Sequence, residues 1–284
     1  MSNRREIALK NKLVAPVLKW VGGKRQLLSD IEKYIPIFTR YYEPFVGGGA
    51  VLFHLQPKKA VINDVNSELM NLYQVIKNNV EELIEDLKKH KNEAGYYYDI
   101  REWDRDKEKY NSLSDIEKAS RMIYLNKTCY NGLFRVNRAG EFNTPFGFYK
   151  NPNIVNEIKL KAVSNYFNNA EITFLNCDFE EAVKGIRKGS FVYLDPPYDP
   201  VSGSANFTGY DKGGFDKEEQ IRLKKLCDTL NDKGVKFLLS NSATDFIKDL
   251  YSGYKIEIIQ ARRAINSKGD LRGEIDEVLV RNYE

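Results

Sequence analysis

The residue pattern most suggestive of chemistry in this sequence is Asp195-Pro196-Pro197-Tyr198, which directly follows the apolar run 191–194. That run predicts a strand ending on a carboxylate. An aromatic exocyclic amine is a poor nucleophile because its lone pair is delocalised into the ring. If the Asp195 carboxylate and the Pro196 carbonyl accepted its two hydrogens, the nitrogen could present its lone pair to an electrophile, while Tyr198 offers a face for stacking a base. The alternative is a merely rigid turn.

A glycine cluster and a second carboxylate follow two other predicted strands. Gly47-Gly48-Gly49 lies between a strand and an apolar helical run, where missing side chains let a ligand approach backbone amides. Asp64 ends the next strand, where a carboxylate can accept hydrogen bonds from ribose hydroxyls. The glycine spacing is not the usual GxGxxG, and glycines at a tight turn are about as often structural. Together with Asp64 they favour a nucleoside-containing cofactor.

The elements that must position these residues are short apolar runs separated by helical patterns. Strands are predicted at 41–45, 60–64, 171–175, 191–194 and 235–239, with a helix at 217–230. Two further strands, at 254–259 and 277–280, are separated by a segment too short for a crossover helix. The sequence therefore predicts an α/β fold whose mostly parallel sheet finishes in an antiparallel hairpin. Ligands of such sheets bind beyond the carboxyl ends of the strands.

The middle of the chain differs in character from both ends. Helical patterns at 69–77, 80–90 and 115–127 precede a stretch rich in Gly, Asn and aromatic residues at 130–150. We therefore expect an inserted, mainly helical domain at 67–167, within a catalytic domain formed by 1–66 and 168–284.

Composition limits the class of protein. With 284 residues, 42% apolar and 30% charged, the chain can build a large core together with a smaller domain. Its apolar runs are too short for a membrane span, and its start lacks the apolar stretch of a secretory signal, which predicts a cytoplasmic protein. Three widely spaced cysteines and two histidines predict reduced packing residues and no metal site.

Charge is distributed unevenly along the chain. Residues 1–40 contain nine Lys/Arg against three Asp/Glu, and residues 119–163 contain seven against two. In contrast, residues 81–117 contain twelve acidic against seven basic residues. This segregation favours a polyanion partner that faces the basic segments, with the acidic stretch turned away. Solvated helix faces are the alternative explanation.

Taken together, these patterns resemble the Dam family of DNA adenine methyltransferases, the D12 class. The resemblance runs in the family's order from about Leu18 to Tyr283. Its segments are Lys19–Lys24, Glu43–Gly49, Ile62–Asp64, Tyr130–Asn137, Cys177–Phe179, Asp195–Tyr198 and Ser240–Ser242. It implies a Rossmann-like class I methyltransferase sheet with an inserted DNA-recognition domain. It also implies methyl transfer from S-adenosylmethionine to the 6-amino group of an adenine flipped out of double-stranded DNA at GATC.

The resemblance assigns residues to the cofactor and to catalysis. Asp64 is expected to hold the ribose, Asp178 and the Phe179 backbone to bind the cofactor's adenine, and Asp195 to contact the methionine amino group as well. Asp195, Pro196 and Tyr198 are the expected catalytic residues. The remaining residues expected to line the cofactor site are Lys19, Trp20, Gly22, Phe45, Gly47 and Gly49.

The resemblance assigns DNA reading to the insert. Tyr130 is expected to wedge into the base stack, Asn131 to partner the orphaned thymine, and Lys19 to contact the first guanine. Five further positions are expected to bind DNA: Leu133, Arg135, Asn137, Pro145 and Tyr149. Arg135 could instead hold only a phosphate. Phe207 and Tyr210 are candidates to close over the target base, and Arg262 and Arg263 to touch the DNA backbone.

Two other classes of protein remain as alternatives. A methyltransferase for RNA or for a protein amide would share the cofactor half, although amide methylation typically goes with Asn at the position of Asp195. A non-catalytic DNA-binding protein would need only the basic insert. The expected enzyme is a site-specific adenine methyltransferase, acting as a monomer or weak dimer. The sequence leaves open whether it serves a restriction system or genome methylation.

Overall fold

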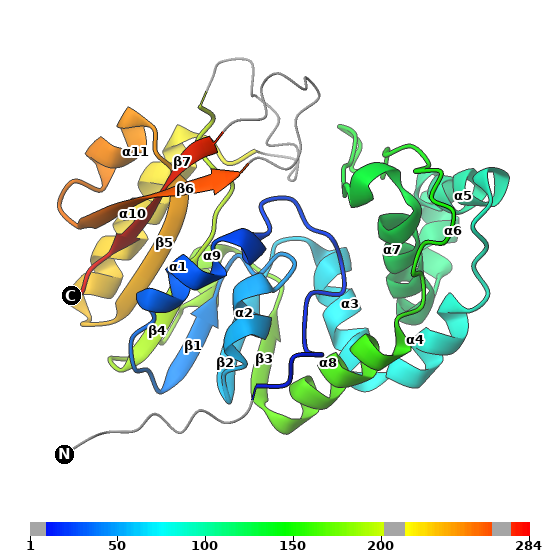
Figure 1. Cartoon of the computed structure of the whole chain (residues 1–284), viewed down its shortest axis with the longest axis horizontal. Coiled ribbons are helices and arrows are strands. Elements are labelled where there is room, and N and C mark those ends of the chain that lie inside the picture. The colour runs from blue at the N-terminus through cyan, green and yellow to red at the C-terminus, as the bar shows by residue number, and fades with distance from the viewer. Residues whose placement is uncertain (1–9, 202–213, 263–273) are drawn as a thin grey trace.

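The computed structural model describes residues 10–201, 214–262 and 274–284. At its centre lies a seven-stranded sheet with the order β3-β2-β1-β4-β5-β7-β6 (Figure 1). Neighbours among the first five strands in this order are parallel, whereas β7 pairs antiparallel with both β5 and β6. The strands are β1 (Arg40–Glu43), β2 (Lys59–Asn63), β3 (Glu171–Leu175), β4 (Ser190–Leu194), β5 (Lys236–Ser242), β6 (Lys255–Arg262) and β7 (Glu274–Arg281). The predicted Rossmann-like α/β class with a terminal antiparallel hairpin is confirmed.

Strand β4 shows why the sheet is covered on both faces. All five of its residues are buried. Phe191 and Tyr193 belong to one apolar core, and the alternating Val192 and Leu194 belong to a second. The first core includes residues of α1 (Leu28–Lys33) and α2 (Ala50–Leu55), and the second includes residues of α9 (Phe179–Ala182), α10 (Lys217–Asp232) and α11 (Asp245–Leu250).

Six α-helices lie between β2 and β3 in the chain, and Figure 1 shows α4 to α7 grouped beside the sheet. They are α3 (Ser67–Asn78), α4 (Val80–Leu87), α5 (Ala94–Arg101), α6 (Lys107–Ser112), α7 (Asp115–Thr128) and α8 (Glu157–Asn169); short 3₁₀ helices are η1 (Lys24–Gln26), η2 (Glu102–Arg105) and η3 (Tyr130–Gly132). Their buried residues continue the first core of the sheet. The division of the chain into two domains stays a prediction.

Two further observations concern the described part of the chain. Cys129, Cys177 and Cys227 are free thiols, and burial raises the pKa of Cys129 to about 12. No helix described here has the length and apolar character needed to cross a membrane.

Candidate active site

The loops that follow β1, β2 and β3 are tied together by one buried amide. The Asn63 side chain, 1% exposed, donates to the carbonyls of Pro44 (3.0 Å) and Cys177 (2.9 Å). Its own carbonyl oxygen accepts from the Cys177 backbone N–H at 2.9 Å. Next to it, the Asp64 carboxylate accepts from the Gly47 N–H at 2.9 Å. The glycine turn, Asp64 and the segment before Asp178 therefore share one edge of the sheet.

The glycine turn owes its sequence to backbone conformation and to close packing. Gly47 and Gly49 have φ values of +46° and +70°, which residues other than glycine rarely adopt. A Cβ on Gly47 would lie 2.9 Å from the Trp20 ring, and one on Gly49 would lie 2.7 Å from Phe53. Trp20 in turn stacks on Phe134 with ring centroids 5.0 Å apart. These glycines therefore have a structural role in the turn, whether or not a ligand also binds there.

Asp178 begins α9 and already has two protein partners. One of its oxygens accepts from the Glu180 N–H at 2.9 Å, and the other pairs with Arg222 of α10. The Arg222 guanidinium also lies 4.2 Å from the centre of the Phe179 ring, which packs against Phe45 at 5.3 Å. Arg222 was not singled out from the sequence, because its partners Asp178 and Glu180 are remote along the chain and only Glu219 is near. The role of Asp178 in binding the cofactor's adenine stays a prediction.

Asp195 follows β4 and is paired with a lysine that the sequence analysis did not assign. The Lys24 ammonium lies 3.0 Å from an Asp195 oxygen and donates to the Gly22 carbonyl at 2.8 Å. It also lies 4.5 Å from the centre of the Tyr198 ring. The ring face expected to stack a base is therefore next to the Lys24 ammonium. The Tyr198 hydroxyl donates to Glu277 of β7 at 2.8 Å.

The electrostatics of Asp195 combine burial with this ion pair. Burial raises its pKa to about 6, Lys24 opposes the shift, and Glu277 adds to it. Because 19% of its side chain is still exposed, an incoming group can reach the carboxylate. Asp195 is therefore an accessible, ionised acceptor at neutral pH. Burial also raises the pKa of Tyr198, so its hydroxyl keeps its proton.

A second buried amide connects the N-terminal segment with the expected DNA-reading segment. Asn126, at the end of α7, accepts from the Lys19 N–H at 2.9 Å and donates to the Lys19 carbonyl at 2.8 Å. It also donates to the Gly132 carbonyl at 3.0 Å. The Lys19 ammonium lies 5.7 Å from the centre of the Tyr149 ring. Two of the expected DNA-binding residues thus lie together, and Asn126 is a positioning residue that sequence reasoning missed.

The expected wedge lies on the surface. Tyr130 is 56% exposed, and its N–H donates to the Pro145 carbonyl at 2.8 Å. Asn131 follows with a left-handed φ of +56° and is also exposed, whereas Leu133 is half-buried. Tyr130 and Asn131 are therefore both exposed enough to meet a partner.

Arg135 and Asn137 have protein partners close by. Arg135 donates through Nε to the Asn143 side chain at 2.7 Å. The Asn137 side-chain oxygen accepts from the N–H groups of Ala139 (2.9 Å) and Glu141 (3.0 Å), which closes the turn at this position. A structural role for Asn137 is therefore visible, and its contact with DNA stays a prediction.

Four sequence candidates receive no test from the structure. Phe207, Tyr210 and Arg263 lie outside the described residues, and only the backbone of Arg262, in β6, is described.

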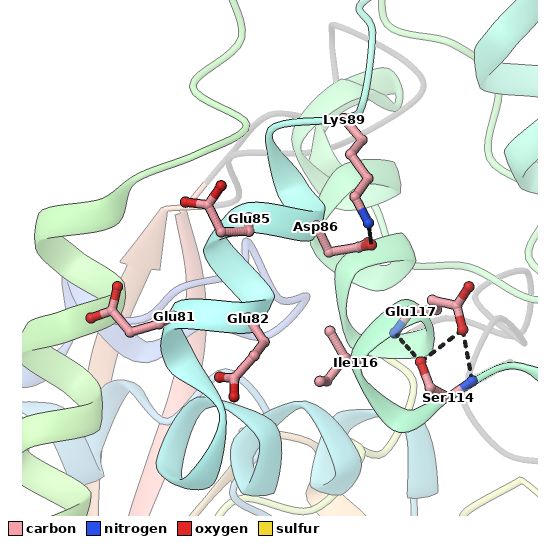
Figure 2. Close-up of a pocket in the computed structure, with 8 residues that line it drawn as sticks. All are labelled: Glu81, Glu82, Glu85, Asp86, Lys89, Ser114, Ile116 and Glu117. Carbon is pink, nitrogen blue, oxygen red and sulfur yellow. Dashed lines mark hydrogen bonds and ion pairs between the residues drawn. The ribbon is translucent and has the colours of Figure 1, made fainter.

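A hollow of about 650 Å³ lies between α4 and α7, and none of the residues that line it follows a strand of the sheet (Figure 2). Figure 2 shows that carboxylates dominate its lining and that Ser114 and Glu117 form a capping box at the start of α7. Its acidic residues are Glu81, Glu82, Glu85, Asp86 and Glu117. Neither here nor elsewhere among residues 10–201, 214–262 and 274–284 do three or more His, Cys, Asp or Glu residues form a group that could hold a metal ion. This surface would repel DNA, in keeping with the predicted charge segregation.

Comparisons with known proteins show the family of this chain. The family model described as D12 class N6 adenine-specific DNA methyltransferase matches residues 20–265. The type II methyltransferase M1.LlaDCHI of Lactococcus lactis subsp. cremoris is 45% identical over 278 residues, covering 96% of this chain and 98% of that protein. M.MjaIII of Methanocaldococcus jannaschii is 45% identical over 291 residues, covering 95% and 99%. The DNA adenine methylase of Escherichia coli is 35% identical over 269 residues, covering 93% of both. The chain belongs to the D12 class of N6 adenine-specific DNA methyltransferases.

Proposed function

We propose that this enzyme methylates the 6-amino group of an adenine flipped out of duplex DNA at GATC, with S-adenosylmethionine as the methyl donor. The observation that carries this proposal is the position of Asp195 and Pro196 directly after β4, with Asp195 partly exposed. Family membership implies both DNA and the methyl donor. The flipping and the site are finer statements that rest on the residues below.

The chain's own residues prepare the amine for attack. The Asp195 carboxylate and the Pro196 carbonyl accept its two hydrogens, which lets the nitrogen move towards tetrahedral geometry. S-adenosylmethionine supplies a methyl group made electrophilic by a cationic sulfur. No general base is needed before attack, because the displaced proton can leave late through Asp195 or water. Tyr198 holds the flipped base by stacking, which requires the Lys24 ammonium to share or leave the ring face.

The residues at the strand ends fit the cofactor chemically. Asp64 offers a carboxylate to the ribose, and Asp178 offers one to the adenine amino group. Phe45 and Phe179 form an apolar wall with ring centroids 5.3 Å apart. Gly47 and Gly49 have positive φ values and add no side chains of their own to the turn. Lys19, Trp20 and Gly22 complete the proposed lining.

Recognition of the DNA sequence falls to the segment after α7. Tyr130 wedges into the stack and Asn131 partners the orphaned thymine, a role that their exposure supports. Arg135 donates to a guanine edge and Lys19 to the first guanine. The other proposed contacts are Leu133, Asn137, Pro145 and Tyr149.

The relatives' names bear on the biological setting. The two at 45% identity are named type II methyltransferases, which favours a restriction-modification setting. The Escherichia coli relative at 35% identity is named DNA adenine methylase, which supports adenine as the base and leaves genome methylation as the second setting.

Methyl transfer to short duplexes tests the proposal. One duplex contains GATC, and each of the others differs from it at a single base of that site. We expect methyl incorporation into the GATC duplex alone, with protection from a nuclease that methylation blocks. Equal incorporation into all duplexes, or incorporation into none of them, would refute the site.

A further inference from the structure

A chain of buried hydrogen bonds lies behind the Asp195 turn. Gln220 of α10 donates to the Pro197 carbonyl at 2.9 Å, and its own side-chain oxygen accepts from Asn241 of β5 at 3.0 Å. The Asn241 oxygen accepts from the Asp199 N–H at 3.1 Å. The Ser242 hydroxyl donates to the Asp199 carbonyl at 2.6 Å. The turn is thus held at both Pro197 and Asp199 from two different elements.

The two prolines explain why the turn needs such partners. Pro196 and Pro197 have no N–H group, so the turn cannot be fixed by donating from these residues. Within their backbone, only the two carbonyl groups can form hydrogen bonds, and each needs a donor from another part of the chain. Gln220 supplies that donor to Pro197. Within the described part of the chain no hydrogen bond reaches the Pro196 carbonyl, which leaves it available to the target amine.

Complete burial makes these bonds specific. Gln220 and Asn241 are 0% exposed and Ser242 is 2% exposed. A buried amide that loses its partner is costly, because water cannot replace the bond. The side chains therefore have one satisfied arrangement, and that arrangement fixes where Pro197 and Asp199 lie. Tyr198, between them, is fixed as a consequence.

We propose that Gln220, Asn241 and Ser242 form a positioning clamp for methyl transfer, which sets the Pro196 carbonyl and Asp195 at the spacing that the target amine requires. The inference rests on the proposed function of the Asp195 turn. None of the three clamp residues touches the substrate. They act through the backbone of Pro197 and Asp199.

The test measures the rate of the chemical step separately from binding. Gln220→Met keeps the length of the side chain but removes both of its hydrogen bonds, and Ser242→Ala removes one hydroxyl. The single-turnover rate on the GATC duplex should fall at least about tenfold in Gln220→Met and about threefold in Ser242→Ala, because small misplacements of reacting groups are costly. Affinities for S-adenosylhomocysteine and for the duplex should stay within about twofold.

A matched control removes a buried hydroxyl far from the turn. Ser120 is 0% exposed and bonds to His90 at 3.0 Å. Ser120→Ala should keep the wild-type single-turnover rate. If Gln220→Met does not fold, Ser242→Ala alone decides the matter. A wild-type rate in a folded clamp variant, or equal losses in rate and binding affinity, would overturn the inference.

A double-mutant comparison separates the clamp from the proposed chemistry. If the clamp acts through the turn, Gln220→Met should lower the single-turnover rate by less than about threefold when Asp195→Asn is already present. In the wild-type background the same substitution should lower the rate by about tenfold. The same loss in both backgrounds would indicate general destabilisation and would overturn the clamp. If Asp195→Asn itself kept the wild-type rate, the proposed function would fail. If Asp195→Asn lost activity while Gln220→Met and Ser242→Ala kept the wild-type rate, the clamp alone would be refuted.

Discussion

The Lys24 ammonium lies 3.0 Å from the Asp195 carboxylate, and its side chain is only 5% exposed. The two residues come from distant parts of the chain, η1 and the end of β4. Burial and Glu277 both raise the pKa of Asp195, and Lys24 opposes them most strongly, ahead of a hydrogen bond from Tyr198. Lys24 therefore controls the pH at which Asp195 becomes an anionic acceptor.

Replacing Lys24 tests this control. In Lys24→Met the opposing charge is gone, so the pKa of Asp195 should rise further, and the acidic limb of the pH profile of kcat/KM should move upward by about one unit or more. Lys24→Arg keeps the charge and should show a smaller displacement. The measurement is methyl transfer to a GATC duplex between about pH 5 and 9. Superimposable profiles of wild type and Lys24→Met would exclude the coupling.

In the wild-type enzyme, activity should depend on the ionisation of Asp195. Its pKa is about 6, so kcat/KM should decline as the pH falls through that value, because a protonated carboxyl is a weaker acceptor for the target amine. The folding contribution has the opposite sign. Since the folded-state pKa lies above the ordinary value of 3.8, Asp195 favours the folded state below about pH 4, and this contribution is lost as the pH rises through about 6.

Comparison with Asp195→Asn isolates that contribution, because Asn does not titrate. The free energy of unfolding of the wild type, relative to Asp195→Asn, should fall between about pH 4 and 6 by an amount on the order of 1 to 3 kcal/mol. Denaturant unfolding of both proteins at several pH values gives this difference. A difference independent of pH would contradict the raised pKa.

Asp64 tests the cofactor site. Asp64→Ala should weaken binding of S-adenosylmethionine by about 1 to 3 kcal/mol, because ribose hydroxyls lose a charged acceptor. DNA affinity without cofactor should change little. Asn66→Ala is a suitable control, because it removes the side-chain cap of α3 next to Asp64 but keeps the Asp64 carboxylate and its 2.9 Å bond from the Asn66 N–H. Calorimetry that finds equal cofactor affinity in Asp64→Ala and the wild type would leave Asp64 only a structural role.

Arg135 distinguishes base reading from phosphate contact. If Arg135 donates to a guanine edge, Arg135→Ala should cost about 1 to 3 kcal/mol of binding free energy at GATC. It should also reduce the preference for GATC over duplexes altered at that guanine. A phosphate contact would instead weaken binding to all duplexes equally. It would also lower the slope of log affinity against log salt concentration by about one unit. The exposed Arg138 in the same segment provides the matched control. Unchanged discrimination in Arg135→Ala would refute its assigned role and leave the enzyme class standing.

The strand ends could be predicted from the sequence, because the signal for each strand lies in a short stretch of neighbouring residues. Short apolar runs bounded by turn residues predicted the strands, and parallel strands bring their carboxyl ends to one edge. The grouping of Gly47 with Asp64 follows from this rule, and the structure joins them at 2.9 Å. The same rule placed Asp195 directly after β4.

Other features could not be predicted because they depend on distant partners. Nothing next to Lys24 or Gln220 in the sequence indicates that each contacts the Asp195 turn, and only the folded sheet brings them there. Helix α8 was missed for a different reason. Its buried Leu160, Val163 and Phe167 have helical spacing, and Asn156 caps its start, but the Pro152 stretch before it obscured the pattern.

The most direct test of the central claim is the rate of methyl transfer by Asp195→Ala on a GATC duplex. Circular dichroism and a cooperative unfolding transition would establish that the variant is folded. Because Asp195 is proposed to orient the target amine, the single-turnover rate should fall by at least about a hundredfold, the scale of losing one preorganised polar contact. A folded Asp195→Ala enzyme that methylates the duplex at nearly the wild-type rate would contradict the account.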